Sequence, residues 1–124
     1  SRLVDLNKLL CPHFGLIDGI VGNEIDEAVS HPVPMNIILG GRDPVAVDAV
    51  EAECMGVPWT DVPYLVKMDL LGIGTANIEN IEVLGTQIRE VRKVFNREWN
   101  AWAFVRTRTV TLYGKLLERI DGNR

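Results

Sequence analysis

The stretch that most constrains the fold is MNIILGGRDPVAVDAV, residues 35–50. Its first six residues are apolar except for one asparagine, as in a strand that is covered on both faces. A Gly-Gly pair then allows a tight turn, Asp43 is a good helix N-cap, and Pro44 suits the first helical position. The sequence therefore predicts a buried strand that turns directly into a capped helix.

The remaining patterns extend this order to helix, strand, strand, helix, helix, strand and a helical tail. Gly56 and Gly72 should end the two central helices, and Thr60 or Asp61 should cap the second. Residues 19–34 read as a long connection. The predicted strands are 14–18, 35–40 and 80–85, and the predicted helices are 3–10, 44–55 and about 60–72.

This order predicts an α/β fold, in which helices flank a small mixed or parallel sheet and a basic helical tail follows. If the strands at 35–40 and 80–85 are parallel, the crossover between them should be right-handed.

Length and composition predict one domain. With 124 residues, 47% of them hydrophobic, the chain can form one modest core but not two. We expect a core at 14–85 and a C-terminal arm at 86–124, within a fragment of a larger protein. No apolar run approaches the roughly 18 residues of a membrane span. The two cysteines, Cys11 and Cys54, are typical of reduced thiols in a cytoplasmic protein.

Charge divides the chain into an acidic part and a basic part. Residues 1–84 hold 4 Lys or Arg and 13 Asp or Glu, a balance of −9, whereas residues 85–124 hold 9 and 4, a balance of +5. The favoured interpretation is that the basic arm packs on the acidic body, on the remainder of a parent protein or on another subunit. Binding to nucleic acid or to an anionic membrane surface is the less favoured alternative.

The aromatic side chains of the arm can also be interpreted either as packing residues or as part of a binding surface. They alternate with arginines, as in some nucleic-acid or membrane surfaces, although packing against the body or a partner is the commoner role. The residues concerned are Trp99, Trp102, Phe104, Arg97, Arg106 and Arg108.

Candidate site residues gather where the predicted strands end. Ligands of open α/β sheets lie beyond the carboxyl ends of strands, where Asp18 and residues 40–43 should meet. Asp48 sits among small apolar residues on the predicted helix, so it either bonds a nearby loop or reaches into a cleft. A structural role as helix N-cap would by itself explain Asp43. Arg42 could bind the carboxylate or phosphate of a ligand.

Motif searches assign no reaction. The glycines of GLIDGIVGN do not have dinucleotide-binding spacing, and no phosphate loop, nucleophile elbow or C-x-x-C occurs. His13 and His31 stand apart from other metal ligands, so the sequence predicts no metal site.

Several segments together resemble the family called domain of unknown function 362 (DUF362). They are LIDGIVGNE, PMNIILGGRDPVAVDAV, MGV, VPYLVKMDLLGIG and IEVLG, which run in order through residues 14–85. The family pattern carries onto Asp18, Gly19, Gly22, Glu24, Asp43, Pro44, Asp48, Gly56, Gly72 and Gly74. One departure is that a glycine-rich run of the family is replaced here by NEIDEA at residues 23–28.

The resemblance implies the C-terminal half of a prokaryotic, cytoplasmic α/β protein whose chemistry is unsettled. Many such proteins carry ferredoxin-like modules with [4Fe–4S] clusters. This chain has only two cysteines, so an iron–sulfur cluster would lie elsewhere in the parent protein and no cofactor is expected within the chain.

Two hypotheses follow, and whether the protein is an enzyme stays open. In the first, the chain contributes a carboxylate-lined cleft for a small-molecule ligand to an iron–sulfur redox protein. The cleft residues would be Asp18, Glu24, Arg42, Asp43 and Asp48. In the second, the chain is a non-catalytic assembly module that docks a partner through its basic aromatic arm.

Overall fold

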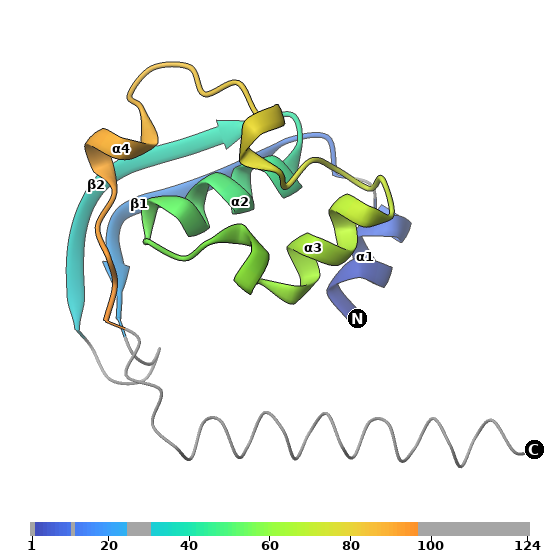
Figure 1. Cartoon of the computed structure of the whole chain (residues 1–124), viewed down its shortest axis with the longest axis horizontal. Coiled ribbons are helices and arrows are strands. Elements are labelled where there is room, and N and C mark those ends of the chain that lie inside the picture. The colour runs from blue at the N-terminus through green and yellow to red at the C-terminus, as the bar shows by residue number, and fades with distance from the viewer. Residues whose placement is uncertain (1, 11, 25–30, 97–124) are drawn as a thin grey trace, which may run out of the picture.

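A computed structural model describes residues 2–10, 12–24 and 31–96 of the chain. Its two strands form a long curved hairpin, and the helices gather within the curve (Figure 1). The main elements are α1 (Arg2–Leu10), β1 (Gly15–Asn23), β2 (Pro32–Gly41), α2 (Pro44–Cys54), α3 (Pro63–Leu70) and α4 (Ile88–Val91). Short 3-10 helices lie at Trp59–Asp61 and Ile78–Asn80.

The sheet corrects the sequence prediction. Within the described residues it has two antiparallel strands, so the expected mixed or parallel sheet is wrong, although the mixture of helices and strands is confirmed. The pairing runs from Gly15 opposite Gly41 to Asn23 opposite Pro32. The first strand does not stop at its Asp-Gly pair as predicted but continues through it. Residues 19–23 and 32–34 of the expected long connection are therefore strand, and adjacent strands joined by a short segment pair antiparallel.

An irregularity in the ladder allows the strand to continue. The register shifts between Gly19 and Val21, and on the opposite strand Asn36 has a φ of 55°. Asparagine tolerates this left-handed conformation better than most residues. Before the shift the even-numbered residues of β1 face outward, and beyond it Gly22 and Glu24 face inward. The single polar residue of the predicted buried strand thus lies where the backbone is irregular.

The predicted third strand is also wrong. Residues 81–84 have no regular secondary structure and pair with no described strand, and a 3-10 helix, Ile78–Asn80, precedes them. Ile81 and Val83 still turn inward and pack against a buried cluster. The alternation of apolar and polar residues at 80–85 therefore predicted the inward-facing side chains correctly, but it did not predict that the segment lacks strand pairing. Because this segment is not a strand, there is no crossover between parallel strands at residues 35–85.

Local signals predicted α2 well. The helix begins at Pro44, Asp43 caps it, and Gly56 follows its end with a φ of 75°. The end of α3 is also confirmed, since Gly72 has a φ of 65°. Its start is not, because Thr60 and Asp61 fall in the 3-10 turn and Val62 occupies the cap position without a side-chain hydrogen bond.

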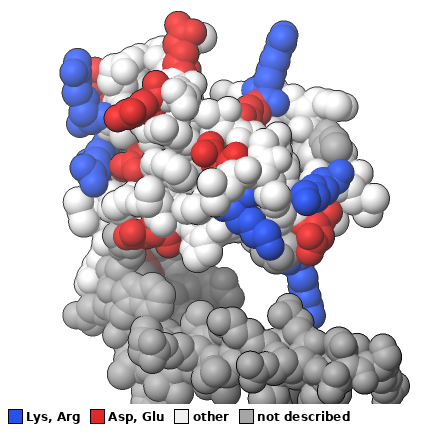
Figure 2. Space-filling view, turned by 45° about the vertical axis from the view of Figure 1, so that its right-hand side comes forward, with Lys and Arg blue, Asp and Glu red and all other residues white. Residues whose placement is uncertain are grey.

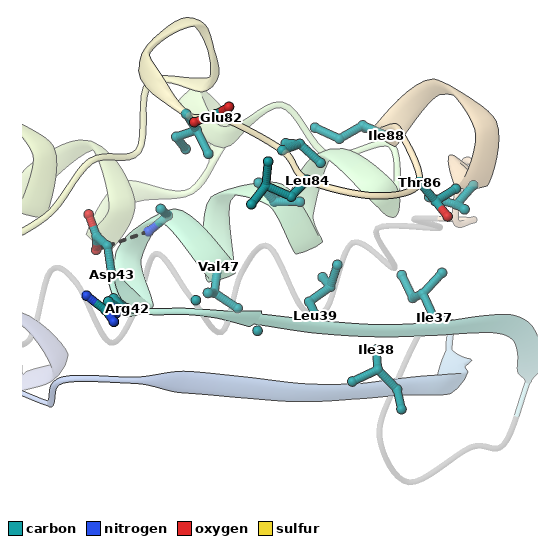
Figure 3. Close-up of a pocket in the computed structure, with 17 residues that line it drawn as sticks. Ile37, Ile38, Leu39, Arg42, Asp43, Val47, Glu82, Leu84, Thr86 and Ile88 are labelled. Atoms are coloured by element: carbon teal, nitrogen blue, oxygen red, sulfur yellow. Dashed lines mark hydrogen bonds between the residues drawn. The ribbon is translucent and has the colours of Figure 1, made fainter.

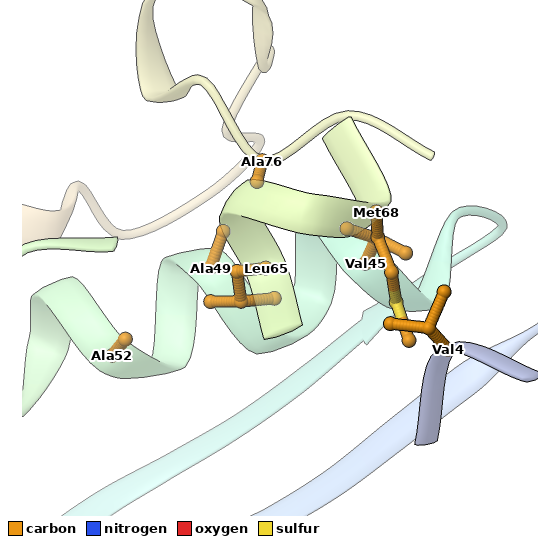
Figure 4. Close-up of a cluster of buried hydrophobic side chains, with 7 residues drawn as sticks. All are labelled: Val4, Val45, Ala49, Ala52, Leu65, Met68 and Ala76. Carbon is orange, nitrogen blue, oxygen red and sulfur yellow. The ribbon is translucent and has the colours of Figure 1, made fainter. Parts of the chain in front are cut away.

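Two apolar clusters fill the space on either side of α2. One joins α2 to α1 and α3 and contains Val4, Val45, Ala49, Ala52, Leu65, Met68 and Ala76 (Figure 4). The other joins α2 to β2 and the end of the described chain and contains Met35, Val50, Cys54 and Phe95. Burial of each of the larger apolar side chains in these clusters is worth about 1.5–3 kcal/mol, so α2, which contacts both clusters, is the central structural element.

Charged side chains are dispersed over one face of the molecule. On the face drawn in Figure 2, Lys and Arg lie among Asp and Glu, with uncharged side chains between them. No described helix has the length and apolar character needed to cross a membrane. Of the predicted helical tail, residues 86–96 contain the short helix α4, and residues 97–124 lie outside the described part, as do the arm's tryptophans and Phe104.

Candidate functional site

Asp43 is fully occupied in holding the start of α2. Its Oδ1 accepts hydrogen bonds from the backbone N–H of Val45 (2.9 Å) and Ala46 (3.3 Å). Its Oδ2 accepts a third from the N–H of Thr75 at 2.7 Å, which ties the loop after α3 to the cap. The structural role that the sequence predicted for Asp43 is thus present, and it extends to a distant loop.

Asp48 points toward α3. The hydroxyl of Tyr64 donates a hydrogen bond to its Oδ2 at 3.2 Å, and both groups are half-buried. Burial raises the pKa of Asp48 above its ordinary value, and this hydrogen bond acts in the opposite direction. Burial, followed by the charge of Asp48, also raises the pKa of Glu51 one turn further along α2. Burial and the same carboxylates raise the pKa of Tyr64 to about 12.

Asp18 lies on the outer face of β1, where it is exposed. Its Oδ1 accepts a hydrogen bond from the N–H of Ile20 at 3.0 Å, next to the irregularity in the ladder. Asp18 also borders a small hollow of about 160 Å³ together with Glu51 and Phe95. It does not reach the start of α2, because Gly15, three residues earlier, is the residue paired with the end of β2.

Glu24 anchors the end of the described chain to the far end of the hairpin. Its Oε1 accepts a hydrogen bond from the N–H of Asn96 at 2.8 Å, and its own N–H donates to the carbonyl of His31 at 3.1 Å. Next to it, Phe95 is buried against Gly22, where an added Cβ would stand 2.6 Å from the ring. Glu24 is therefore far along the hairpin from Asp43 and has a structural partner.

Arg42 and Asp43 are the two predicted residues that share a pocket. This pocket has a volume of about 500 Å³ and lies between the inner side of β2, one face of α2 and the segment 81–91. Figure 3 shows Ile37 and Leu39 pointing into it and Ile38 pointing away. Its lining is Ile37, Ile38, Leu39, Gly40, Gly41, Arg42, Asp43, Ala46, Val47, Val50, Ile81, Glu82, Val83, Leu84, Thr86, Ile88 and Val91.

The five predicted site residues are therefore distributed over several places. Arg42 and Asp43 meet at one end of the pocket, Asp48 faces α3, Asp18 lies on the outer face of β1, and Glu24 lies at the far end of the hairpin. Their convergence in a single cleft is not part of the described arrangement. Among residues 2–10, 12–24 and 31–96, no three His, Cys, Asp or Glu side chains are grouped as metal ligands would be.

Sequence reasoning missed Glu82 and Glu51. Glu82 lines the pocket opposite Arg42, and it stands in a segment that was assigned to a strand. The alternation of Ile81 and Val83 was the available signal that this segment turns one face toward the core. Glu51 follows Asp48 at helical spacing, but its half-burial beside β1 depends on the hairpin, which the sequence did not predict.

Comparison with known proteins gives one family model that matches part of the chain. Residues 1–53 match the model of the domain of unknown function (DUF362), and this range includes the GRDPVAVDA stretch. The resemblance proposed from the sequence, which ran through residues 14–85, is thereby confirmed as far as residue 53, over the hairpin and nearly all of α2. No curated protein and no solved structure matches the chain.

Proposed function

We propose that this chain, whose first 53 residues are similar to the domain of unknown function 362, is an assembly module. In this proposal its docking face is the outer face of the hairpin, and the partner is the remainder of a parent protein or another subunit. The docking face is defined by the exposed apolar residues Phe14, Leu16, Ile20, Val21 and Ile38.

The exposure of this apolar face is the observation that carries the proposal. Leu16 is 70% exposed, Ile38 67% and Ile20 49%. An antiparallel sheet that faces water normally turns polar side chains outward, and here most of the outward residues of β1 are apolar. Soluble proteins rarely leave such patches open unless another protein covers them.

The patch is continuous across both strands. The side chains of Phe14 and Leu16 both lie over Gly40 of β2, each 3.3 Å from where a Cβ on that glycine would stand. Asp18, which is paired with Ile38, is the one charged residue in the row. A partner that covers this face would bury side chains from both strands and would have to accommodate one carboxylate near the centre.

The free edge of β1 supports the same proposal. Within the described residues β1 pairs on one side with β2 and with no strand on the other. The edge of β2 is different, because Lys93 Nζ donates a hydrogen bond to the carbonyl of Pro34. An uncovered edge presents backbone N–H and C=O groups to an added strand, which is a common mode of protein recognition. A partner can therefore extend the sheet at β1 while it covers the docking face.

The family resemblance suggests what the partner carries. We propose that it holds a ferredoxin-like [4Fe–4S] module and that the assembly works in a prokaryotic cytoplasm. Support comes from the match over residues 1–53 and from the composition of this chain, which has two cysteines. The described one, Cys54, is buried.

A ligand cleft lined by carboxylates is the second candidate function. One observation favours it, namely that Arg42 and Asp43 line the same pocket. Both oxygens of Asp43 already accept backbone hydrogen bonds, so this carboxylate is poorly placed to act as a general base. Docking is the better-supported function because its surface needs no rearrangement.

Site-specific photo-crosslinking in the cell tests the proposed docking. A photoreactive phenylalanine analogue at Leu16 or Ile38 should give a discrete crosslinked product, whereas the same probe at Leu70 should not. Leu70 is the matched control because it is 80% exposed but belongs to α3 rather than to the docking face. Iron and sulfide in the anaerobically purified product would support the iron–sulfur proposal. Equal crosslinking at Leu16 and Leu70 would exclude the docking face.

A further inference from the structure

The pocket behind β2 is lined at one end by two charged residues on opposite walls, and neither has a partner among the residues that the structure describes. Arg42 follows β2, and Glu82 lies on the segment 81–91 across the opening (Figure 3). Both are exposed, and neither makes a hydrogen bond or an ion pair in the described part of the chain. The third charge at this end, Asp43, is satisfied by three backbone N–H groups. Among the described residues, the pocket thus offers one free cation, Arg42, and one free anion, Glu82.

Apart from Thr86, the rest of the pocket is lined by apolar side chains and glycines. Its walls are aliphatic side chains from β2, α2 and α4, among them Leu39, Val47 and Ile88, which Figure 3 shows pointing toward the same space. The volume of about 500 Å³ lies within the range of roughly 300–1,000 Å³ that is usual for small-molecule sites. A ligand that fits this pocket has an apolar body and charged groups at one end.

We infer that this pocket binds an apolar zwitterion, either a free α-amino acid with a large aliphatic side chain or a short peptide of such residues. The ligand carboxylate pairs with Arg42, its ammonium pairs with Glu82, and its side chains occupy the aliphatic walls. An arginine fork suits a carboxylate, and an ammonium group donates to a carboxylate from any of its three N–H groups. A simple fatty acid would leave Glu82 unpaired and close to a second negative charge.

This inference is independent of the proposed docking. The pocket lies on the inner side of β2, whereas the docking face consists of outward residues such as Leu16 and Ile38. Failure of the crosslinking experiment therefore leaves the pocket untouched, and failure of ligand binding leaves the docking face untouched.

Chemical-shift titration of the full chain with four probes tests the inference. L-Leucine carries both charges, 4-methylpentanoate lacks the ammonium, and 3-methylbutylamine lacks the carboxylate. L-Leucyl-L-leucine separates the two charges further, so its affinity relative to leucine distinguishes a peptide site from an amino-acid site. Leucine or the dipeptide should give saturable shifts at pocket residues such as Val47 and Ile88, with at least about ten-fold higher affinity than either single-charge probe.

Charge-neutral variants assign the two ends of the ligand. Arg42→Gln should weaken binding of the preferred zwitterion about ten-fold without weakening the amine, whereas Glu82→Gln should weaken the zwitterion without weakening 4-methylpentanoate. Arg89→Gln is the matched control, because Arg89 is an exposed arginine of α4 that does not line the pocket. Equal losses in the Arg42 and Arg89 variants would overturn the inference.

A variant that fills the pocket locates the binding. Ala46 lines the pocket from α2 and is half-buried, so Ala46→Phe should place a ring in the space and abolish binding while the spectrum stays that of a folded protein. The inference is overturned if neither zwitterion gives saturable shifts, if a single-charge probe binds equally well, or if the folded Ala46→Phe variant still binds.

Discussion

A Cβ atom on Gly74 would stand 2.5 Å from Oδ1 of Asp43, and also 2.6 Å from a methyl group of Val45. The loop after α3 therefore approaches the start of α2 too closely for any side chain. This approach is what brings the N–H of Thr75 within 2.7 Å of the same carboxylate. One aspartate thus connects two parts of the chain that are 32 residues apart.

Removal of the Asp43 carboxylate should lower the free energy of unfolding by more than the loss of an ordinary helix cap does. Asp43→Ala leaves three N–H groups without an acceptor, and we expect a loss of about 2–3 kcal/mol in the free energy of unfolding, measured by urea denaturation. Gly74→Ala should lose more than about 1 kcal/mol through the clash. Glu79→Ala, at an exposed position, should change less than about 0.5 kcal/mol. A loss for Asp43→Ala no larger than that control would contradict the proposed connection.

Stability should rise as the pH falls from neutral, because burial raises the pKa values of Asp48 and Glu51. Each group binds its proton more tightly in the folded state than in the unfolded state. Above the pKa of the folded state, burial of the charged carboxylate lowers the free energy of unfolding. This destabilisation is relieved as the pH falls toward the ordinary pKa values of 3.8 for Asp48 and 4.5 for Glu51. Chemical denaturation at a series of pH values should show this slope. Asp48→Asn should flatten it and raise stability at pH 7, whereas an unchanged slope would contradict the assignment.

Tyr64 should titrate at about pH 12, above the ordinary value of 10.0. Its raised pKa means that stability is lost as the pH rises through this interval, because the unfolded state releases the proton first. Ultraviolet difference spectra during an alkaline titration follow tyrosinate formation directly. The late component should disappear in Tyr64→Phe and should move to lower pH in Asp48→Asn, since the neighbouring carboxylate contributes to the shift.

Leu65 and Leu70 form a matched pair on α3 that tests the buried cluster. Leu65 is 0% exposed and lies within the cluster around α2, whereas Leu70 is 80% exposed. We expect Leu65→Ala to lower the free energy of unfolding by about 2–5 kcal/mol and Leu70→Ala to change it by less than about 0.5 kcal/mol. Similar effects of the two substitutions would mean that α3 does not pack as described.

Cys54 should be unreactive in the folded protein. It is 1% exposed, and burial, followed by the charges of Glu51 and Glu53, raises the pKa of its thiol. In a Cys11→Ser background, modification of Cys54 by a thiol reagent should follow the rate of unfolding and should accelerate with urea. Rapid modification without urea would show that α2 separates from the hairpin more readily than its packing indicates.

The sequence predicted correctly those features of the fold that depend on residues close together in the chain. Asp43, Pro44 and Gly56 each act within one helical turn of α2, and their roles were confirmed. The hairpin was missed because Asp18 and Gly19 look like the end of a strand, and the register shift that carries the strand past them depends on pairing with β2.

The candidate site shows the same division. The cap role of Asp43 is local and was predicted, whereas its bond to Thr75 joins segments that no spacing rule relates. Glu82 lines the same pocket as Arg42 because residues 81–84 run along the core without pairing with a described strand. Sequence patterns report which side chains turn inward, but the distance between two segments depends on the packing of α2 between them.

Phe95 and Glu24 have a mechanical consequence. The ring seated against Gly22 and the carboxylate that holds the N–H of Asn96 fasten the chain to the tip of the hairpin just before residue 97. The N–H of Phe95 also donates a hydrogen bond to the carbonyl of Met55, directly after α2. A load applied to the segment that follows is therefore shared between β1 and the C-terminal end of α2, and both would have to release the chain before it separates.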